Sequence, residues 1–223
     1  LELTKTLDKT VYNNQVLDNM DIEQERGITI KSHPIQMNYK NNNKIFKLNL
    51  IDTPGHVDFT YEVSRSMAAC EGALLLIDCT QGVEAQTVSN TYLAIESDLE
   101  IIPVINKIDM KNANIESAEN QIIELLGCSK NDILYISSKE GTGVDKIFSH
   151  VIERIPHPIS LPGNSFSALI FDSYFDQYRG VIIYVRVFSG SIKKGSIAKF
   201  FNYYGTHEIL EVGILQIERI KKD

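Results

Sequence analysis

Two apolar runs that each end in a polar segment limit the folds open to this 223-residue chain. Residues 72–79 read GALLLIDC, and residues 100–106 read EIIPVIN. Runs of this length without alternation are typical of parallel strands buried on both faces of a sheet. Residues 132–137 form a third, shorter run of the same kind. We therefore expect parallel strands in the middle of the chain.

Apolar residues recur at helical spacing in two segments that follow these runs: Val88, Tyr92 and Ile95 in the first, and Val144, Ile147, Val151 and Ile155 in the second. Thr142 and Asp145 have the spacing of a capping pair for the second helix. Alternating strands and helices predict an α/β fold with a doubly wound, mostly parallel sheet that is covered by helices on both faces.

An alternating strand at 44–51, KIFKLNLI, precedes this region. Three asparagines at 41–43 separate it from residues 34–40, and turn-rich tripeptides of this kind join antiparallel strands. We expect a hairpin here.

The pattern changes at IPHPISLPGN, residues 155–164, which holds three prolines and a glycine. It predicts a linker at 158–164 between a first domain, 1–157, and a second domain, 165–223. Short alternating segments in the second domain, separated by glycines, predict an antiparallel β-barrel. Because this domain is small, we expect a partial barrel. The expected strands are 166–171, 181–188, 196–201 and 208–214.

Composition restricts the function classes. The net charge is −7 and the pI is near 5.3, so the chain gains little from non-specific attraction to nucleic-acid phosphates. No apolar run approaches the roughly 18 residues that a membrane span needs. The cysteines Cys70, Cys79 and Cys128 lack the spacing of metal ligands and are expected to be buried thiols of a reducing compartment.

The segment Asp52-Thr53-Pro54-Gly55-His56 directly follows the predicted strand at 44–51. Ligands of a doubly wound sheet bind off the carboxyl ends of its strands, and Asp52 there can reach Mg²⁺, usually through water. Gly55 lets a backbone N–H approach a γ-phosphate and lets the loop change conformation. His56 could orient an attacking water. Alternatively, the segment is a polar turn with Asp52 as a helix cap.

Asn106-Lys107-Ile108-Asp109 follows the second apolar run. The carboxylate of Asp109 can accept hydrogen bonds from guanine N1 and N2, which adenine does not offer. Asn106 can contact the base or tether neighbouring loops, and the stem of Lys107 can lie over the ring. The alternative is an ordinary loop with one solvated lysine.

Two weaker segments fit the same site. Ser137-Ser138-Lys139 follows the third run, and its hydroxyl and backbone groups could contact the guanine carbonyl oxygen. Thr29, within RGITI at 26–30, could ligate Mg²⁺ and contact the γ-phosphate in one nucleotide state only. Taken alone, RGITI would be interpreted as the start of a strand that is rich in β-branched residues.

The order and spacing of these motifs resemble translational GTPases. Three longer stretches look most like the elongation factor four (LepA) family: DNMDIEQERGITIK at 18–31, NLIDTPGHVDFTYEVSRSMAACEGALLLIDCTQGVEAQTV at 49–88 and FDSYFDQYRGVIIYVRVFSGSIKKG at 171–195. The resemblance implies a P-loop GTPase fold and a ribosome-dependent GTPase that moves tRNAs back by one codon. Elongation factor G-like or TypA-like GTPases are alternatives within the same class.

The resemblance implies GTP or GDP and Mg²⁺ as ligands, and rRNA, ribosomal proteins and tRNA as partners. It implies Thr29 and Asp52 at the metal and His56 as the catalytic, water-positioning residue. The implied nucleotide-binding residues are Asp52, Thr53, Pro54, Gly55, His56, Asn106, Lys107, Asp109, Ser137, Ser138 and Lys139. Ser138 replaces the alanine that the family commonly carries there. The implied location is the cytoplasm with peripheral association at the inner membrane, or else an organelle matrix. The sequence contains no amphipathic segment that would support the membrane association.

No G-x-x-x-x-G-K-[ST] sequence occurs in the 223 residues. The resemblance places that loop just before Leu1-Glu2-Leu3-Thr4, so we expect a GTPase domain without its first strand and phosphate loop, as part of a longer protein with further C-terminal domains. This chain alone should bind GTP weakly and hydrolyse it negligibly. A non-catalytic ribosome-binding module is the alternative, although the presence of Thr29 and His56 disfavours it.

Overall fold

The computed structural model describes residues 3, 4, 6, 21–159, 162, 165–214 and 220–222. The predicted linker and the helix end expected at residues 1–4 lie partly outside these residues. The chain divides into two compact units. The first comprises Leu1–Gln24, His33–Asp52 and Ile159–Asp223, and the second comprises Glu25–Ser32 and Thr53–Pro158.

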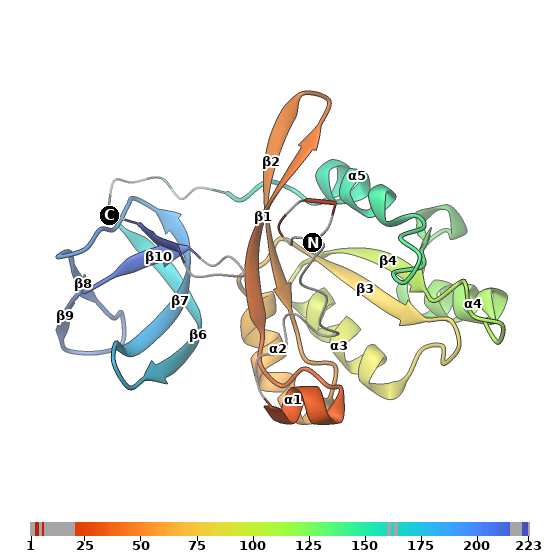
Figure 1. The fold of residues 1–223 in the computed structure, drawn as a ribbon, viewed down its shortest axis with the longest axis horizontal. Coiled ribbons are helices and arrows are strands. Elements are labelled where there is room, and N and C mark those ends of the chain that lie inside the picture. The colour runs from red at the N-terminus through yellow and green to blue at the C-terminus, as the bar shows by residue number, and fades with distance from the viewer. Residues whose placement is uncertain are drawn as a thin grey trace. The chain divides into compact units, whose positions relative to one another are not determined.

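The second unit contains a parallel sheet in the order β3-β4-β5 (Figure 1). Its strands are β3 (Gly72–Asp78), β4 (Glu100–Asn106) and β5 (Leu134–Tyr135). The first two strands and the parallel pairing are confirmed. The third strand is shorter than expected, because the short 3-10 helix η2 (Lys130–Asp132), begun by a capping box between Ser129 and Asp132, occupies the start of the predicted run.

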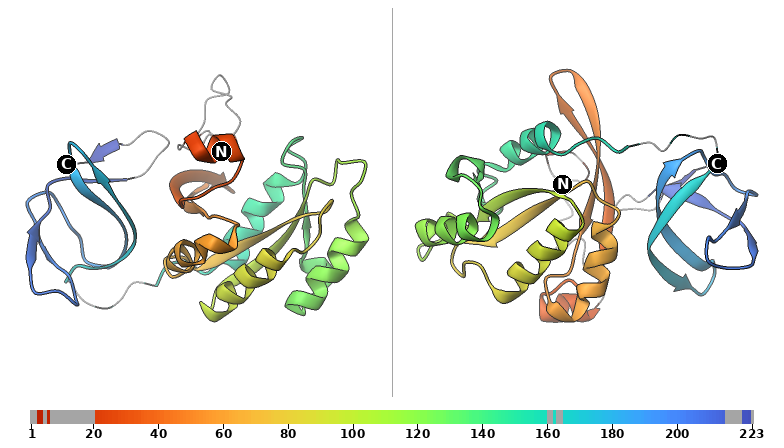
Figure 2. Two further views of the ribbon diagram at one scale, coloured as in Figure 1. Left: turned by 90° about the horizontal axis from the view of Figure 1, so that it is seen from below. Right: turned by 180° about the vertical axis from the view of Figure 1, so that it is seen from behind.

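Helices cover both faces of this sheet (Figures 1 and 2). Besides η2, the helical elements that follow β2 are η1 (Val57–Phe59), α2 (Thr60–Met67), α3 (Ala85–Glu96), α4 (Ile115–Leu126) and α5 (Val144–Arg154). On one face Ile105 packs with Ala118 and Ile122 of α4. On the other face Ile102 and Val104 pack against α5. Successive residues of β4 point to opposite faces, so one strand joins the two halves of the core.

Helix α5 does not begin as predicted. Its N-cap is Gly143, with φ +73° and no side-chain hydrogen bond, so the expected capping pair of Thr142 and Asp145 is wrong. The backbone of Thr142 is instead used in a bridge, where its carbonyl oxygen accepts a hydrogen bond of 3.0 Å from the N–H of Ser137. A Cβ at position 143 would collide with the carbonyl oxygen of Tyr135, and only glycine fits there.

The face of β3 that adjoins Ile102 and Val104 is partly open. Leu74 and Leu76 are their register partners, yet these two leucines are 38% and 55% exposed, whereas Ile102 and Val104 are fully buried. The apolar surface is therefore closed over β4 and open over β3, where burial would be favourable.

The first unit contains the predicted hairpin, β1 (His33–Asn41) with β2 (Lys44–Asp52), in antiparallel register. Asn42 and Asn43 at its turn both have positive φ, 46° and 61°, a conformation that asparagine tolerates well. Helix α1 (Asp21–Arg26) precedes this hairpin in the chain.

After residue 165 the chain forms antiparallel strand pairs, as the alternation predicted. They are β6 (Ser167–Asp176) with β7 (Gly180–Ser189), β8 (Ile197–Lys199) with β9 (Thr206–Glu208), and β10 (Val212–Ile214) with β11 (Ile220–Lys222). The strand expected at 208–214 is divided between β9 and β10. Mixed α/β structure thus precedes antiparallel strand pairs.

All three cysteines are free; Cys79 is buried, whereas Cys70 and Cys128 are half-buried. Within the described part of the chain, no helix combines the length and the apolar character that a membrane span requires.

Candidate functional site

The loops that leave β4 and β5 meet at one edge of the parallel sheet. The N–H of Ile136 donates a 2.8 Å hydrogen bond to the carbonyl of Ile105, and the N–H of Ile108 donates one of 3.4 Å to the carbonyl of Ile136. Parallel strands place their carboxyl ends at the same edge, where α/β folds bind ligands. The two predicted base-reading loops are therefore neighbours.

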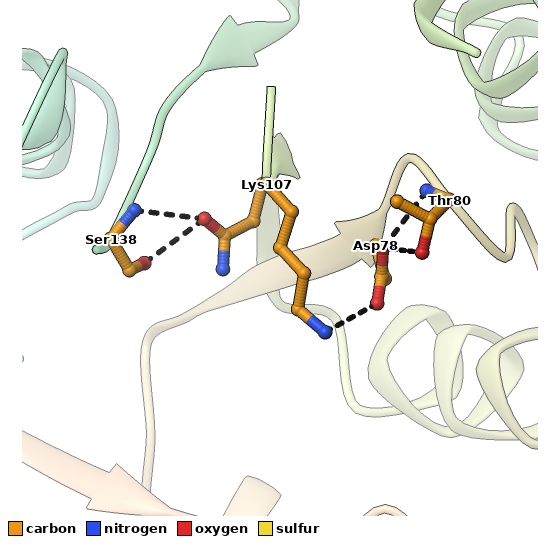
Figure 3. A network of polar contacts seen from close by, with 5 residues as sticks. Asp78, Thr80, Lys107 and Ser138 are labelled. Carbon is orange, nitrogen blue, oxygen red and sulfur yellow. Dashed lines mark hydrogen bonds and ion pairs between the residues drawn. The ribbon is translucent and has the colours of Figure 1, made fainter. Parts of the chain in front are cut away.

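Asn106 ties these loops together. Its Oδ1 accepts hydrogen bonds from the N–H of Ser138 at 3.0 Å and from the hydroxyl of Ser138 at 3.1 Å (Figure 3). Of the two roles open to Asn106 from the sequence, the structure shows the tethering one. The bonds also engage the backbone N–H of Ser138, which is therefore not free to contact a ligand.

Asp109 is held by the same pair of loops. The hydroxyl of Ser137, itself fully buried, donates a 2.6 Å hydrogen bond to Oδ1 of Asp109. This bond, helped by the positive charges of Lys139 and Lys107, lowers the pKa of the Asp109 carboxyl against a smaller opposing effect of burial. The group is thus an ionised acceptor at neutral pH, as guanine recognition requires.

Lys107 reaches sideways to the neighbouring strand. Its Nζ lies 2.6 Å from Oδ2 of Asp78, the last residue of β3, and its backbone φ is +64° (Figure 3). Sequence reasoning did not single out Asp78 or its partner Thr80. A signal existed, because Asp78 stands near the end of its apolar run just as Asn106 does in the next run, and the two residues are register partners.

The segment after β2 leads into η1. Pro54 is fully buried, and the amide of Asn90 donates a 3.4 Å hydrogen bond to the carbonyl of Gly55. Nothing lies within 4 Å of a Cβ built at Gly55, so its surroundings are open to a ligand. The ring of His56 is half-exposed; its Nδ1 caps η1 by accepting a 3.3 Å hydrogen bond from the N–H of Asp58. Thr53 is half-buried between Asp52 and Pro54.

Thr29 and Asp52, the predicted metal ligands, belong to different compact units. Both are half-buried and both make polar interactions within the chain. One hydroxyl and one carboxylate suit Mg²⁺, which usually completes its shell with water and phosphate oxygens. The described residues contain no group of three or more His, Cys, Asp or Glu side chains arranged to hold a metal ion. The metal pair stays a prediction.

Comparison with protein families decides the class of this chain. The family described as "Elongation factor Tu GTP binding domain" matches residues 2–157. The chain belongs to this family of translational GTPases. The family is described as GTP-binding, which agrees with the ionised carboxylate of Asp109 and with the hydrogen-bonded loops at the sheet edge.

Relatives of this chain support the predicted resemblance to elongation factor four. It is 54% identical to elongation factor 4 of Phocaeicola vulgatus over 222 residues, which is all of this chain and 37% of that protein. It is 52% identical to elongation factor 4 of Amoebophilus asiaticus over 223 residues, again all of this chain and 38% of that protein. The resemblance is confirmed, and the chain spans little more than a third of these relatives.

Solved structures support the fold. A bacterial selenocysteine-specific elongation factor, EF-Sec, superposes with a TM-score of 0.71 at 19% identity, covering 93% of this chain and 37% of that one. A protein from Thermus thermophilus superposes with a TM-score of 0.74 at 14% identity, covering 99% of this chain and 47% of that one. At these identities the likeness concerns the fold alone.

Proposed function

We propose that this chain is the guanine-reading part of a GTP-hydrolysing, ribosome-dependent translation factor of the elongation factor 4 type. The observation that carries the proposal is the hydrogen bond from Ser137 to Asp109, which holds an ionised carboxylate where the loops of β4 and β5 meet. We also propose a GTP-binding domain at 1–157, a linker at 158–164 and a β-barrel domain at 165–223.

Guanine recognition follows from the acceptors and donors at this edge. A carboxylate has about four acceptor positions, so Asp109 can hold Ser137 and still accept from guanine N1–H and N2–H₂. Adenine offers an acceptor at N1 and no amine at C2, so it would leave the carboxylate unpaired. Because Ser138 N–H already serves Asn106, we assign the contact with the guanine carbonyl oxygen to the backbone N–H of Lys139.

The phosphate end is assigned from the predicted residues. Thr29 and Asp52 would hold Mg²⁺, which neutralises charge on the phosphate oxygens. The segment Thr53–Gly55 would lie along the γ-phosphate, with the N–H of Gly55 as donor. His56 would orient the attacking water, and its attachment to Asp58 restricts the directions that the ring can take.

In the described sheet β3 is an edge strand paired with β4, which supports a GTPase sheet that takes a further strand beside β3. Leu74 and Leu76 of β3 are partly exposed on one face of the sheet, and the 223 residues hold no G-x-x-x-x-G-K-[ST] sequence to cradle phosphates. We infer a doubly wound, P-loop type sheet. The ribosome and tRNAs are the proposed partners of the whole protein, which would act in the cytoplasm.

The proposal is tested by base selectivity. Titration of the ¹⁵N-labelled chain with GDP or ADP, followed by NMR, should shift the amide signals of residues 106–109 and 137–139 with GDP only. Asp109→Asn should reverse the preference toward XDP, because an amide offers a donor that pairs with the C2 carbonyl of xanthine. Asp145→Asn, at an exposed position on α5, is the matched control. Equal responses to GDP and ADP in the unmodified chain would overturn guanine recognition.

A further inference from the structure

The side chain of Asp78 is oriented by Thr80, two residues after it, independently of its ion pair with Lys107. Its Oδ1 accepts hydrogen bonds from the N–H and the hydroxyl of Thr80, at 2.9 and 2.7 Å (Figure 3). Its other oxygen, Oδ2, lies 2.6 Å from Nζ of Lys107. Burial alone would raise the pKa of this carboxyl, but the bonds from Lys107 and Thr80 together lower it. Asp78 is thus an oriented anion at neutral pH.

The two partners differ in how far they are exposed. The side chain of Asp78 is 18% exposed, whereas that of Lys107 is 53% exposed. A half-exposed lysine normally samples many rotamers, and an ion pair at such a position contributes little to stability. Here the short, charge-assisted bond to a preoriented carboxylate restricts the lysine to one direction.

The ion pair adds little to the pairing of the strands. β3 and β4 are already paired in parallel over their full length, and the register includes Asp78 with Asn106. Beyond the strands, the N–H of Cys79 also donates a 3.1 Å hydrogen bond to the carbonyl of Asn106. What the bond from Asp78 determines is therefore the path of the Lys107 side chain rather than the position of either strand.

That path crosses the strand ends beside the base-reading groups. Lys107 lies between Asn106 and Asp109 in a single loop, and it adopts φ +64°, which an L-residue takes only at a cost in energy. Its four methylenes run from the end of β4 toward the end of β3 (Figure 3). An extended apolar stem of this kind can cover the face of a ring whose edge is read by Asp109.

We propose that Asp78 is a positioning residue, which holds Lys107 stretched across the ends of β3 and β4 so that the lysine stem forms one wall of the base site. This inference rests on the proposed guanine recognition. The wall contacts the face of the ring, whereas Asp109 contacts its edge. Loss of the wall should therefore weaken all guanine-site ligands by a similar factor and leave the choice of base unchanged.

A double-mutant cycle tests the inference in the full chain. Asp78→Asn should lower the affinity for GDP by about 3- to 10-fold, the loss expected when a side chain is no longer preorganised. Lys107→Met, which keeps an apolar stem without the charge, should weaken GDP binding as well. In the Lys107→Met background, Asp78→Asn should have no further effect, because Asp78 acts only through the lysine. Preference for GDP over ADP should persist in each variant.

Controls separate positioning from general destabilisation. Glu100→Gln breaks the ion pair of Glu100 with Arg154 at the opposite end of β4 and should leave GDP affinity unchanged. Thr80→Val removes one hydrogen bond from Asp78 without removing a charge and should lower GDP affinity by a smaller factor than Asp78→Asn. If Asp78→Asn does not fold, the Thr80→Val and Lys107→Met variants decide the matter.

Additive effects of Asp78→Asn and Lys107→Met would overturn the positioning role, as would an unchanged GDP affinity in Thr80→Val. Either result can occur while the unmodified chain still prefers GDP, and guanine recognition would then stand without this inference. A chain that does not distinguish GDP from ADP would instead contradict the proposed function itself.

Discussion

The buried hydroxyl of Ser137 donates a 2.6 Å hydrogen bond to the carboxylate of Asp109, which lies 28 positions earlier in the chain. The bond spans two loops that follow different strands, and it restricts rotation of a carboxylate that would otherwise move freely at the sheet edge. Groups held in the geometry that a ligand needs lose less conformational entropy when the ligand binds.

Ser137→Ala should raise the pKa of the Asp109 carboxyl toward its ordinary value, because the hydrogen bond from Ser137 is the main cause of its lowered pKa. A pH titration of the Asp109 carboxyl carbon by ¹³C NMR measures this. GDP affinity should fall about 3- to 10-fold, as expected for a hydrogen bond worth roughly 1 kcal/mol. Ser138→Ala is the matched control, since its hydroxyl bonds Asn106 and not Asp109. Identical Asp109 titrations in both variants would contradict the assignment.

Tyr135 should make the stability of the chain fall at alkaline pH. Burial, together with the hydrogen bond from its hydroxyl to Glu119 at 2.9 Å, raises the pKa of Tyr135 to about 12. An unfolded tyrosine ionises near pH 10, so the stabilisation is complete below about pH 10 and is lost as the pH rises toward 12. Urea unfolding between pH 9 and pH 11.5 should show a smaller loss in Tyr135→Phe than in the unmodified chain.

Tyr178→Phe is the control for that measurement, because Tyr178 is 97% exposed and its loss should leave the pH dependence as it is. A Tyr135→Phe variant that loses stability with pH as steeply as the unmodified chain would rule out the role assigned to Tyr135.

Substitutions at Gly143 and Gly141 distinguish the energetic cost of backbone strain from that of a steric collision. Both have positive φ, +73° and +75°, but a Cβ at Gly143 would collide with the Tyr135 carbonyl oxygen, whereas one at Gly141 would meet nothing within 4 Å. Gly141→Ala should cost about 1 kcal/mol of unfolding free energy, the penalty of the left-handed conformation. Gly143→Ala should cost more than about 2 kcal/mol, because strain and collision add. Equal losses in urea unfolding would show that the collision is relieved.

Substitutions at Ile102 and Leu76 test whether the face of β3 is open. Ile102 is fully buried against α5, whereas Leu76 on the adjacent strand is 55% exposed. Ile102→Ala should therefore destabilise the chain by about 2–5 kcal/mol, and Leu76→Ala by less than about 1 kcal/mol. Urea unfolding of both variants measures the contrast. A large loss from Leu76→Ala would mean that this face is covered in solution.

Much of the fold could be predicted because its signals are local. The apolar runs at 72–79 and 100–106 predict buried parallel strands, and the asparagines at 41–43 predict the hairpin turn. The strand predicted at 132–137 is shorter than expected, and the side-chain cap predicted at Thr142 is absent, because other hydrogen bonds of these residues compete with the pattern. Asp132 completes a capping box instead of starting a strand, and the backbone of Thr142 pairs with Ser137 instead of leading into a side-chain cap.

The sequence by itself determined which residue types follow each strand, and with them the class of the protein, because those motifs are contiguous in the chain. Only the tertiary structure decided which of the polar groups meet: Ser137 with Asp109, Ser138 with Asn106, and Lys107 with Asp78. The register of parallel strands brings these residues to one edge from positions roughly 28 to 32 residues apart. That register depends on how the helices pack on both faces of the sheet, which no local pattern contains.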